Sequence, residues 1–360
     1  MLSDASKSAG SQGESLASVL RAGNRAFEAR DYADAARQYA RVVAVDGHCA
    51  SAWYRLGNAR WRRGDRVGSI EAYRRAVGEE PTRARAWQNL STVELSVHAW
   101  SEAAIAATKA VSLDPTRSKA WNNLAVARFA QGDHLGAETA LRRAVETAPN
   151  LAVAWANLGR LLADSRRPDA ARAAYERALS LGETDVAVRL GLATVFVALG
   201  EGARAEDVLE AAVRAEPLAV DAWVALGDVR RSRSAHGPAL EAYEAASAAA
   251  EDMPAPVRHR SARRRCHAAL VLAAEALDAS DRDEFTRAAD RLRQASEASG
   301  DASVEDEVLK SALDGCLDMA HKRSTGRPGP EWIMPERVRG VLLRALSSRS
   351  EPADRGGGGS

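Results

Sequence analysis

Apolar and polar positions along the chain recur with a period of 34 residues between residues 16 and 253. Tryptophan marks the register, because four tryptophans follow one another at this interval and a fifth lies two intervals further on: Trp53, Trp87, Trp121, Trp155 and Trp223. No insertion or deletion interrupts the register, which therefore divides the segment into seven repeats beginning at residues 16, 50, 84, 118, 152, 186 and 220. A period of this length is typical of arrays in which each repeat contributes one small supersecondary unit.

Two positions within the repeat always carry a small residue. With tryptophan at position 4, position 8 holds Gly23, Gly57, Ser91, Ala125, Gly159, Ala193 and Gly227, and position 20 holds Ala35, Ser69, Ala103, Ala137, Ala171, Ala205 and Ala239. Two antiparallel helices cross closely only where side chains are short, so that a large neighbour fits opposite. Position 24 supplies the large neighbours, namely Tyr39, Tyr73, Leu141, Tyr175, Leu209 and Tyr243. Each repeat is therefore predicted to be a pair of packed antiparallel helices.

Proline and glycine mark the ends of these predicted helices. Position 32 holds Pro81, Pro115, Pro149 and Pro217, and position 15 holds Gly64, Gly132 and Gly200. Proline cannot continue a helix interior, so position 32 separates one repeat from the next. Glycine commonly follows the last turn of a helix, so position 15 marks the turn between the two helices of a pair.

The stretches "AWYRLGNARWRRGD" and "AWNNLAVARFAQGD" in residues 52–65 and 120–133 resemble the tetratricopeptide repeat family. Repeats 2 to 5 match its pattern best, whereas repeat 1 lacks the tryptophan, repeat 6 has Arg189 there and repeat 7 has Ser234 at the turn. The resemblance implies an all-α, right-handed superhelical solenoid of antiparallel helix pairs with a C-terminal helical cap. It also implies that the first helices of the repeats line a concave groove that holds a protein or peptide.

Composition changes outside the repeats suggest five parts. We expect a disordered N-terminal segment (1–15), seven repeats (16–253), a degenerate helical hairpin with a capping helix (254–323), a linker with an amphipathic helix (324–349) and a flexible tail (350–360). Apolar residues 338, 341, 342, 345 and 346 lie on one face of the amphipathic helix. That helix either packs on the last hairpin or docks on a partner.

The resemblance assigns positions 2, 5, 6, 9, 12 and 13 to the groove. The candidate partner-binding residues at these positions are Tyr54, Arg55, Asn58, Trp61, Arg62, Arg85, Gln88, Asn89, Lys119, Asn122, Asn123, Phe129, Asn157 and Arg160. Asn89, Asn123 and Asn157 all stand at position 6, and each amide could pair with the backbone of an extended peptide, as in the similar helical array of the glycosyltransferases that modify Ser/Thr with N-acetylglucosamine. The alternative is that these asparagines form a solvated helix face.

The aromatic residues have two expected roles. The position-4 tryptophans are expected to pack in the core. Trp61 and Phe129 are expected to be exposed in the groove, where they either anchor a ligand or pack on the adjacent helix.

Asn58, Asn89 and Lys119 also match three of the five positions of the clamp that chaperone-binding repeats use for a C-terminal carboxylate. Tyr54 and Asn123 replace two cations of that pattern, which argues against a chaperone tail.

Charge is uneven along a chain whose formal net charge is only +1. Residues 50–83 contain eight arginines against four acidic residues, which gives +4, and this favours an acidic partner. Residues 278–318 contain twelve acidic against five basic residues, which gives −7. The acidic segment could dock on the basic second repeat, within one chain or between chains. Ion pairing on a solvated surface is the alternative.

The remaining sequence features exclude several classes of function. Three distant cysteines, the lack of a signal peptide and the lack of a long apolar run favour a cytoplasmic protein outside the membrane. Histidines and cysteines show no metal-ligand spacing, and no catalytic motif is present, so no enzyme, cofactor or metal is expected. The near-zero net charge makes nucleic acid an unlikely partner. We therefore expect a scaffold or adaptor. The alternatives are a self-assembling solenoid that forms a homo-oligomer and, less favoured, an RNA-binding helical repeat.

Overall fold

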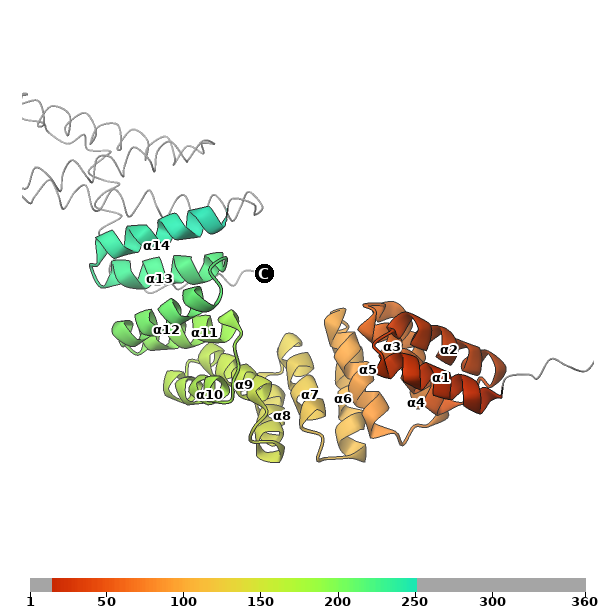
Figure 1. Cartoon of the computed structure of the whole chain (residues 1–360). Helices are drawn as coiled ribbons and strands as arrows, with labels where there is room; N and C mark the ends of the chain where they lie inside the picture. Colours follow the sequence, from red (N-terminus) through yellow and green to blue (C-terminus); the bar gives the residue numbers. More distant parts are fainter. Residues whose placement is uncertain (1–14, 251–360) are drawn as a thin grey trace, which may run out of the picture. The chain divides into compact units, whose positions relative to one another are not determined.

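The computed structural model describes residues 15–250, which contain fourteen α-helices and no β-strand (Figure 1). They form two compact units, residues 15–183 and residues 184–250. In both units each odd-numbered helix packs against the even-numbered helix that follows it. The all-α helical-repeat fold expected from the sequence is therefore confirmed. The parts expected at residues 1–14 and beyond residue 250, the cap and the amphipathic helix included, lie outside the described residues.

The first unit contains five helix pairs, one for each of repeats 1 to 5. The helices are α1 Leu16–Glu28, α2 Tyr32–Val45, α3 Ala50–Arg62, α4 Arg66–Glu79, α5 Ala84–Ser96, α6 Trp100–Leu113, α7 Ser118–Ala130, α8 His134–Thr147, α9 Ala152–Asp164 and α10 Pro168–Ser180. The second unit contains two pairs from repeats 6 and 7: α11 Val186–Ala198, α12 Gly202–Ala215, α13 Val220–Ser232 and α14 His236–Ala249.

In the turn inside every pair, the residue at position 15 adopts a left-handed backbone conformation. Gly64, Gly132 and Gly200 adopt φ of 80°, 81° and 76° there, as the sequence predicts. The other four turns place a residue with a side chain in this conformation, with φ of 55° to 62°: Arg30, His98, Arg166 and Ser234. Left-handed backbone crowds a Cβ atom, so these four turns carry a local cost that the glycine turns avoid.

The two helices of a pair meet at a matched small and large residue. A Cβ built on Gly57 would lie 2.8 Å from Cδ1 of Tyr73, closer than real Cβ atoms approach a neighbour. Glycine at position 8 therefore accompanies tyrosine at position 24 in repeats 1, 2, 5 and 7, and alanine accompanies leucine in repeats 4 and 6. Repeat 3 pairs Ser91 with Ala107. In the other six repeats the two positions compensate each other in volume, which keeps the crossing closely packed.

Each tryptophan at position 4 ties its helix to the preceding loop. The five indoles are half-buried, and their Nε1–H groups donate to the backbone oxygen of position 32 in the previous repeat, at 2.7 to 3.0 Å: Gly47, Pro81, Pro115, Pro149 and Pro217. In repeat 6, Nη1 of Arg189 donates instead to the oxygen of Thr184 at 2.7 Å. The tryptophans therefore combine the expected packing with a hydrogen bond that fixes the loop between repeats.

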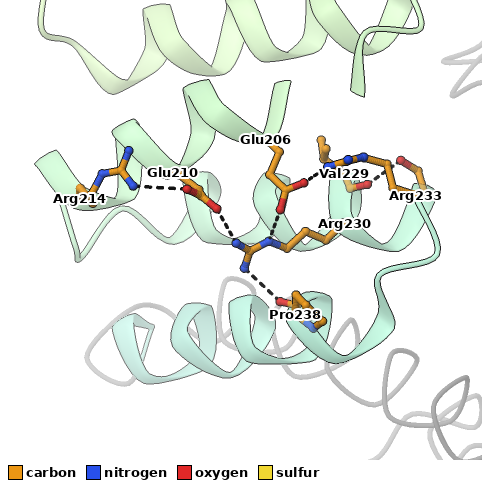
Figure 2. Close-up of polar contacts among 8 residues, drawn as sticks. Glu206, Glu210, Arg214, Val229, Arg230, Arg233 and Pro238 are labelled. Atoms are coloured by element: carbon orange, nitrogen blue, oxygen red, sulfur yellow. Dashed lines mark hydrogen bonds and ion pairs between the residues drawn. The ribbon is translucent and has the colours of Figure 1, made fainter. Parts of the chain in front are cut away.

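In the second unit, ion pairs also join neighbouring repeats (Figure 2). Arg230 on α13 reaches Glu206 and Glu210 on α12, at 2.8 and 2.7 Å, and donates to the backbone oxygen of Pro238 at 3.2 Å. Arg233 also contacts Glu206. A largely buried guanidinium thus connects three helices, and such charge-assisted contacts are stronger than neutral hydrogen bonds.

Candidate partner-binding face

The candidate residues lie on the first helices of repeats 2 to 5. Positions 2, 5, 6, 9, 12 and 13 follow helical spacing, so on α3, α5, α7 and α9 they form one stripe per helix. We call these four stripes the first-helix face. Neighbouring stripes are joined directly, because hydrogen bonds connect α3 to α5, α5 to α7 and α7 to α9.

Exposure divides the fourteen candidate residues into three groups. Arg62, Arg85, Lys119 and Arg160 are exposed. The half-buried residues are Tyr54, Arg55, Asn58, Trp61, Gln88, Asn89, Phe129 and Asn157. Asn122 and Asn123 are only 9% and 8% exposed, so a peptide at the surface has little access to them.

The three asparagines at position 6 direct their amide groups toward the preceding repeat. Nδ2 of Asn89 donates to Oδ1 of Asn58 at 3.0 Å, and Nδ2 of Asn123 donates to Oγ1 of Thr92 at 2.8 Å. Nδ2 of Asn157 donates to Oδ1 of Asn122 at 2.8 Å. The amide N–H groups of these asparagines therefore join adjacent repeats, and the expected pairing of these residues with a peptide backbone stays a prediction.

The same asparagine network includes the large tyrosines of the helix pairs. The hydroxyl of Tyr73 donates to Oδ1 of Asn58 at 2.6 Å, and the hydroxyl of Tyr39 donates to Oδ1 of Asn24 at 2.9 Å. Arg55 donates to Asn24 as well, from position 6 of the second repeat. Burial raises the pKa of the Tyr73 hydroxyl above its ordinary value. In repeats 1 and 2, the asparagine oxygen at position 9 thus accepts one hydrogen bond from its own repeat and one from the next repeat.

The groove aromatics are less exposed than expected. Trp61 and Tyr54 pack against a buried cluster that includes Tyr73 and Leu90, and both are half-buried. Phe129 is half-buried too, with the guanidinium of Arg160 4.9 Å from its ring centroid. Trp61 and Phe129 therefore pack on neighbouring elements, and their role as anchors for a ligand stays a prediction.

The exposed charge on this face is positive over repeats 2 to 4. Arg62, Arg85 and Lys119 have no ion-pair or hydrogen-bond partner among residues 15–250. The stripes of α3, α5 and α7 contain no acidic residue, and the first one on the face is Asp164 in repeat 5. The basic character expected for the second repeat therefore extends along three consecutive first helices.

One buried carboxylate lies beside this face and was not singled out by the sequence. Glu94 on α5 is 2% exposed; its Oε1 accepts from Arg74 at 2.9 Å, and its buried Oε2 has no hydrogen-bond partner among the described residues. Burial raises the pKa of Glu94 above its ordinary value, and Arg74 opposes this shift. The position offered no signal in the sequence except that repeats 2, 4 and 7 have arginine where repeat 3 has Glu94.

Metal-binding arrangements are not found in the part of the chain that the structure describes. No cluster of three or more histidine, cysteine or acidic residues could hold a metal ion there. Within the same residues, no helix combines the length and the apolar composition that a membrane crossing requires.

Comparisons with known proteins agree on the type of repeat. A sequence model of the tetratricopeptide-repeat family described as the cilia and flagella-associated protein 70 C-terminal domain matches residues 11–259. A tetratricopeptide repeat protein from Parabacteroides merdae has a similar structure, with 13% identity, coverage of 70% of this chain and 99% of that chain, and a TM-score of 0.53. The structure of pilF from Pseudomonas aeruginosa is also similar, with 17% identity, coverage of 56% of this chain and 92% of that chain, and a TM-score of 0.50. Identities this low show a common fold and nothing further. No curated protein sequence matches this chain significantly.

Proposed function

Because this chain belongs to the tetratricopeptide-repeat family described as the cilia and flagella-associated protein 70 C-terminal domain, we propose that it is an interaction scaffold that binds an acidic peptide segment on its first-helix face. Membership of the family supports the general role of binding a protein or peptide. The acidic character of the partner and the residues that contact it are our proposal. Repeat families use continuous helical surfaces of this kind to hold extended segments.

The observation that carries the proposal is the positive, unpaired charge of α3, α5 and α7. Arg62, Arg85 and Lys119 stand on three adjacent helices, and no acidic residue of these stripes neutralises them. Cations without local partners raise the association rate of an acidic ligand and disfavour a basic one. A peptide with carboxylates spaced along its length could pair with each cation in turn.

The side-chain amides of the first-helix face offer a second kind of contact with a peptide, through the atoms that the hydrogen bonds between repeats leave unused. The donors of Asn89 and Asn157 are used between repeats, but their Oδ1 atoms accept no hydrogen bond within residues 15–250. An amide oxygen accepts from a backbone N–H group. We therefore expect these asparagines to contact a peptide through their oxygens, and Gln88 to donate through its Nε2.

A peptide-display selection tests the proposal without knowledge of the natural partner. The full chain is the target and a library of random peptides is the probe. We expect the selected peptides to be enriched in Asp and Glu, and the enrichment to disappear when the target is the Arg85→Glu/Lys119→Glu variant. Arg75→Glu/Arg177→Glu is the matched control, because both arginines are exposed, lie on second helices and have no ion pair within the described residues.

Selected peptides that lack acidic enrichment would contradict the proposal, as would acidic peptides that bind the first variant and the control equally. Self-assembly through the ends of the array stays a prediction, which sedimentation of the full chain tests.

A further inference from the structure

A second charged surface lies at the turns of repeats 2 and 3, outside most of the first-helix face. Arg62, Arg63 and Arg66 follow one another through the turn between α3 and α4, and all three are exposed. Val67 is 79% exposed and Val97 is 37% exposed. We call these five residues the turn-edge surface.

The register of the repeats places Val97 beside Arg66 and Val67. Gln131, at position 14 of repeat 4, donates to Oγ of Ser101, at position 18 of repeat 3, at 3.2 Å. In the second unit, a Cβ built on Gly202, at position 17, would lie 3.2 Å from Cδ of Arg233, at position 14 of the next repeat. Figure 2 shows the same arginine reaching back to Glu206 on the preceding repeat. Position 14 therefore lies against positions 17 and 18 of the preceding repeat, and Val97 occupies position 14.

The acidic residues closest in sequence to the three arginines already have other partners. Oδ1 of Asp65 accepts from the backbone N–H of Gly68 at 2.9 Å, and its Oδ2 lies 3.8 Å from Nε of Arg60. Glu71 also pairs with Arg60, at 3.4 Å. Arg62, Arg63 and Arg66 have no ion pair within residues 15–250. The turn-edge surface thus combines three uncompensated positive charges with two exposed valines.

One segment of the same chain has the complementary composition. Residues 297–318 contain seven acidic residues and one lysine, which gives −6, together with Val304, Val308, Leu309, Leu313 and Leu317. We propose that the turn-edge surface docks residues 297–318 of its own chain. Carboxylates meet the arginines, and apolar side chains cover Val67 and Val97. Unlike charges on apposed surfaces both attract and orient the two segments.

The connecting chain does not restrict this docking. Residues 251–296 supply 46 residues, and an extended chain spans about 3.3 Å per residue, so this length can reach roughly 150 Å. A tethered segment also binds at a high effective concentration, which favours docking within one chain over docking between chains in dilute solution.

Docking would have a consequence for partner binding, and this consequence rests on the proposed function. Arg62 belongs to both the turn-edge surface and the first-helix face. A docked acidic segment would therefore compete with an acidic peptide at the second repeat. The docking itself does not depend on whether such a peptide exists, so the two proposals fail independently.

Energy transfer within the full chain tests the docking directly. Cys316 lies inside the acidic segment and accepts one dye, after Cys49→Ser and Cys266→Ser remove the other thiols. Ala33→Cys accepts the second dye, because Ala33 is exposed at position 18 of repeat 1, next to position 14 of repeat 2, which is Arg63. The charge reversal is Arg62→Glu/Arg63→Glu/Arg66→Glu. The control Arg25→Glu/Arg75→Glu/Arg177→Glu changes the net charge equally at exposed arginines elsewhere in the first unit, and helical circular dichroism verifies that both variants fold.

We expect high transfer efficiency at about 0.01 M salt and loss of at least half of it at about 1 M, where the Debye length falls from about 30 Å to about 3 Å. We expect the same loss in the charge-reversal variant at low salt, and retention of the transfer in the control. Low transfer in the parent chain at low salt overturns the proposal, and so does equal transfer in the two variants. Transfer that arises only between separately labelled chains also overturns it, because it assigns the acidic segment to a second copy.

Discussion

Replacing Gly57 with alanine should destabilise the helix pair α3–α4, although the same substitution usually stabilises a helix. The new Cβ would lie 2.8 Å from the ring of Tyr73, which is 1% exposed and cannot move away without disturbing the core. Overpacking of this kind costs about 1–3 kcal/mol. The better helix propensity of alanine offsets about 1 kcal/mol of this cost, so we expect a net loss of up to about 2 kcal/mol.

The chain itself supplies the compensating change. Repeat 4 has the buried residues Ala125 and Leu141 at the two positions where repeat 2 has Gly57 and Tyr73. Tyr73→Leu alone should cost about 1–3 kcal/mol, because it leaves space beside Gly57 and removes the hydrogen bond to Asn58. In the double variant, the alanine fills that space. We expect a favourable coupling of at least about 1 kcal/mol between the two substitutions.

Urea unfolding of the full chain, followed by far-ultraviolet circular dichroism, measures the three variants against the parent chain. Gly78→Ala is the matched control: a Cβ at this position in α4 has no neighbour within 4 Å, so the variant should be stabilised by about 0.5–1 kcal/mol. Crowding at Gly57 is contradicted if Gly57→Ala stabilises the chain as Gly78→Ala does, or if the two repeat-2 substitutions are additive.

Three further predictions concern a turn, a loop and a buried carboxylate. His98→Gly should stabilise the chain by about 1 kcal/mol, measured by urea unfolding, because it relieves a left-handed turn with φ of 58°. Trp87→Phe should cost about 1 kcal/mol in the same assay, because the ring loses its 2.8 Å hydrogen bond to the oxygen of Pro81. Glu94→Gln should change the pH dependence of unfolding. Burial raises the pKa of Glu94 above 4.5, so the folded chain binds this proton more tightly than the unfolded chain. The parent chain should therefore gain stability relative to the Gln variant as the pH falls from 7 toward 4.5, measured as the difference between their unfolding midpoints at each pH.

Each of these predictions has a clear opposite result. An unchanged or lower midpoint for His98→Gly would show that this turn is unstrained, and an unchanged midpoint for Trp87→Phe would show that the indole hydrogen bond contributes nothing. A constant difference between the parent chain and Glu94→Gln across the pH range would show that the pKa of Glu94 is the same in the folded and unfolded chains.

The helix pairs could be predicted from the sequence, because close packing of the two helices requires particular side-chain sizes at fixed positions. This requirement recurs every 34 residues without interruption. Small residues at position 8 face large ones at position 24, and Gly57 with Tyr73 shows the contact that this pattern requires. The left-handed turn at position 15 was predictable where it holds glycine, as at Gly64. It was not predictable at His98 or Arg166, because a residue with a side chain adopts that conformation far less often than glycine does.

The role of the asparagines was harder to predict, because a repeat period says which residues share a position but not which way an amide donates. A signal was nevertheless present. Each Asn at position 6 in repeats 3 and 4 follows a polar acceptor at position 9 of the preceding repeat, Asn58 before Asn89 and Thr92 before Asn123. Where position 9 is apolar, at Val126, Asn157 bonds to Asn122 instead.

The tryptophan hydrogen bonds also correspond to a pattern in the sequence, which the composition alone does not show. A tryptophan at position 4 and a proline at position 32 of the preceding repeat occur together four times, and all four indoles donate to the proline oxygen. The sequence pattern predicts core packing for the tryptophans, and this packing alone does not indicate a partner for their N–H groups. A buried or half-buried indole generally needs one, and the loop oxygen at position 32 satisfies that need.

The most direct test of the central claim is the dissociation constant of one acidic, display-selected peptide for the full chain, measured by fluorescence anisotropy. We predict that Arg85→Glu/Lys119→Glu weakens binding at least about tenfold, which corresponds to about 1.4 kcal/mol, without shifting the unfolding midpoint. The control Arg75→Glu/Arg177→Glu should bind as tightly as the parent chain. Equal affinity for all three proteins would contradict the claim that the exposed cations of the first helices hold the partner.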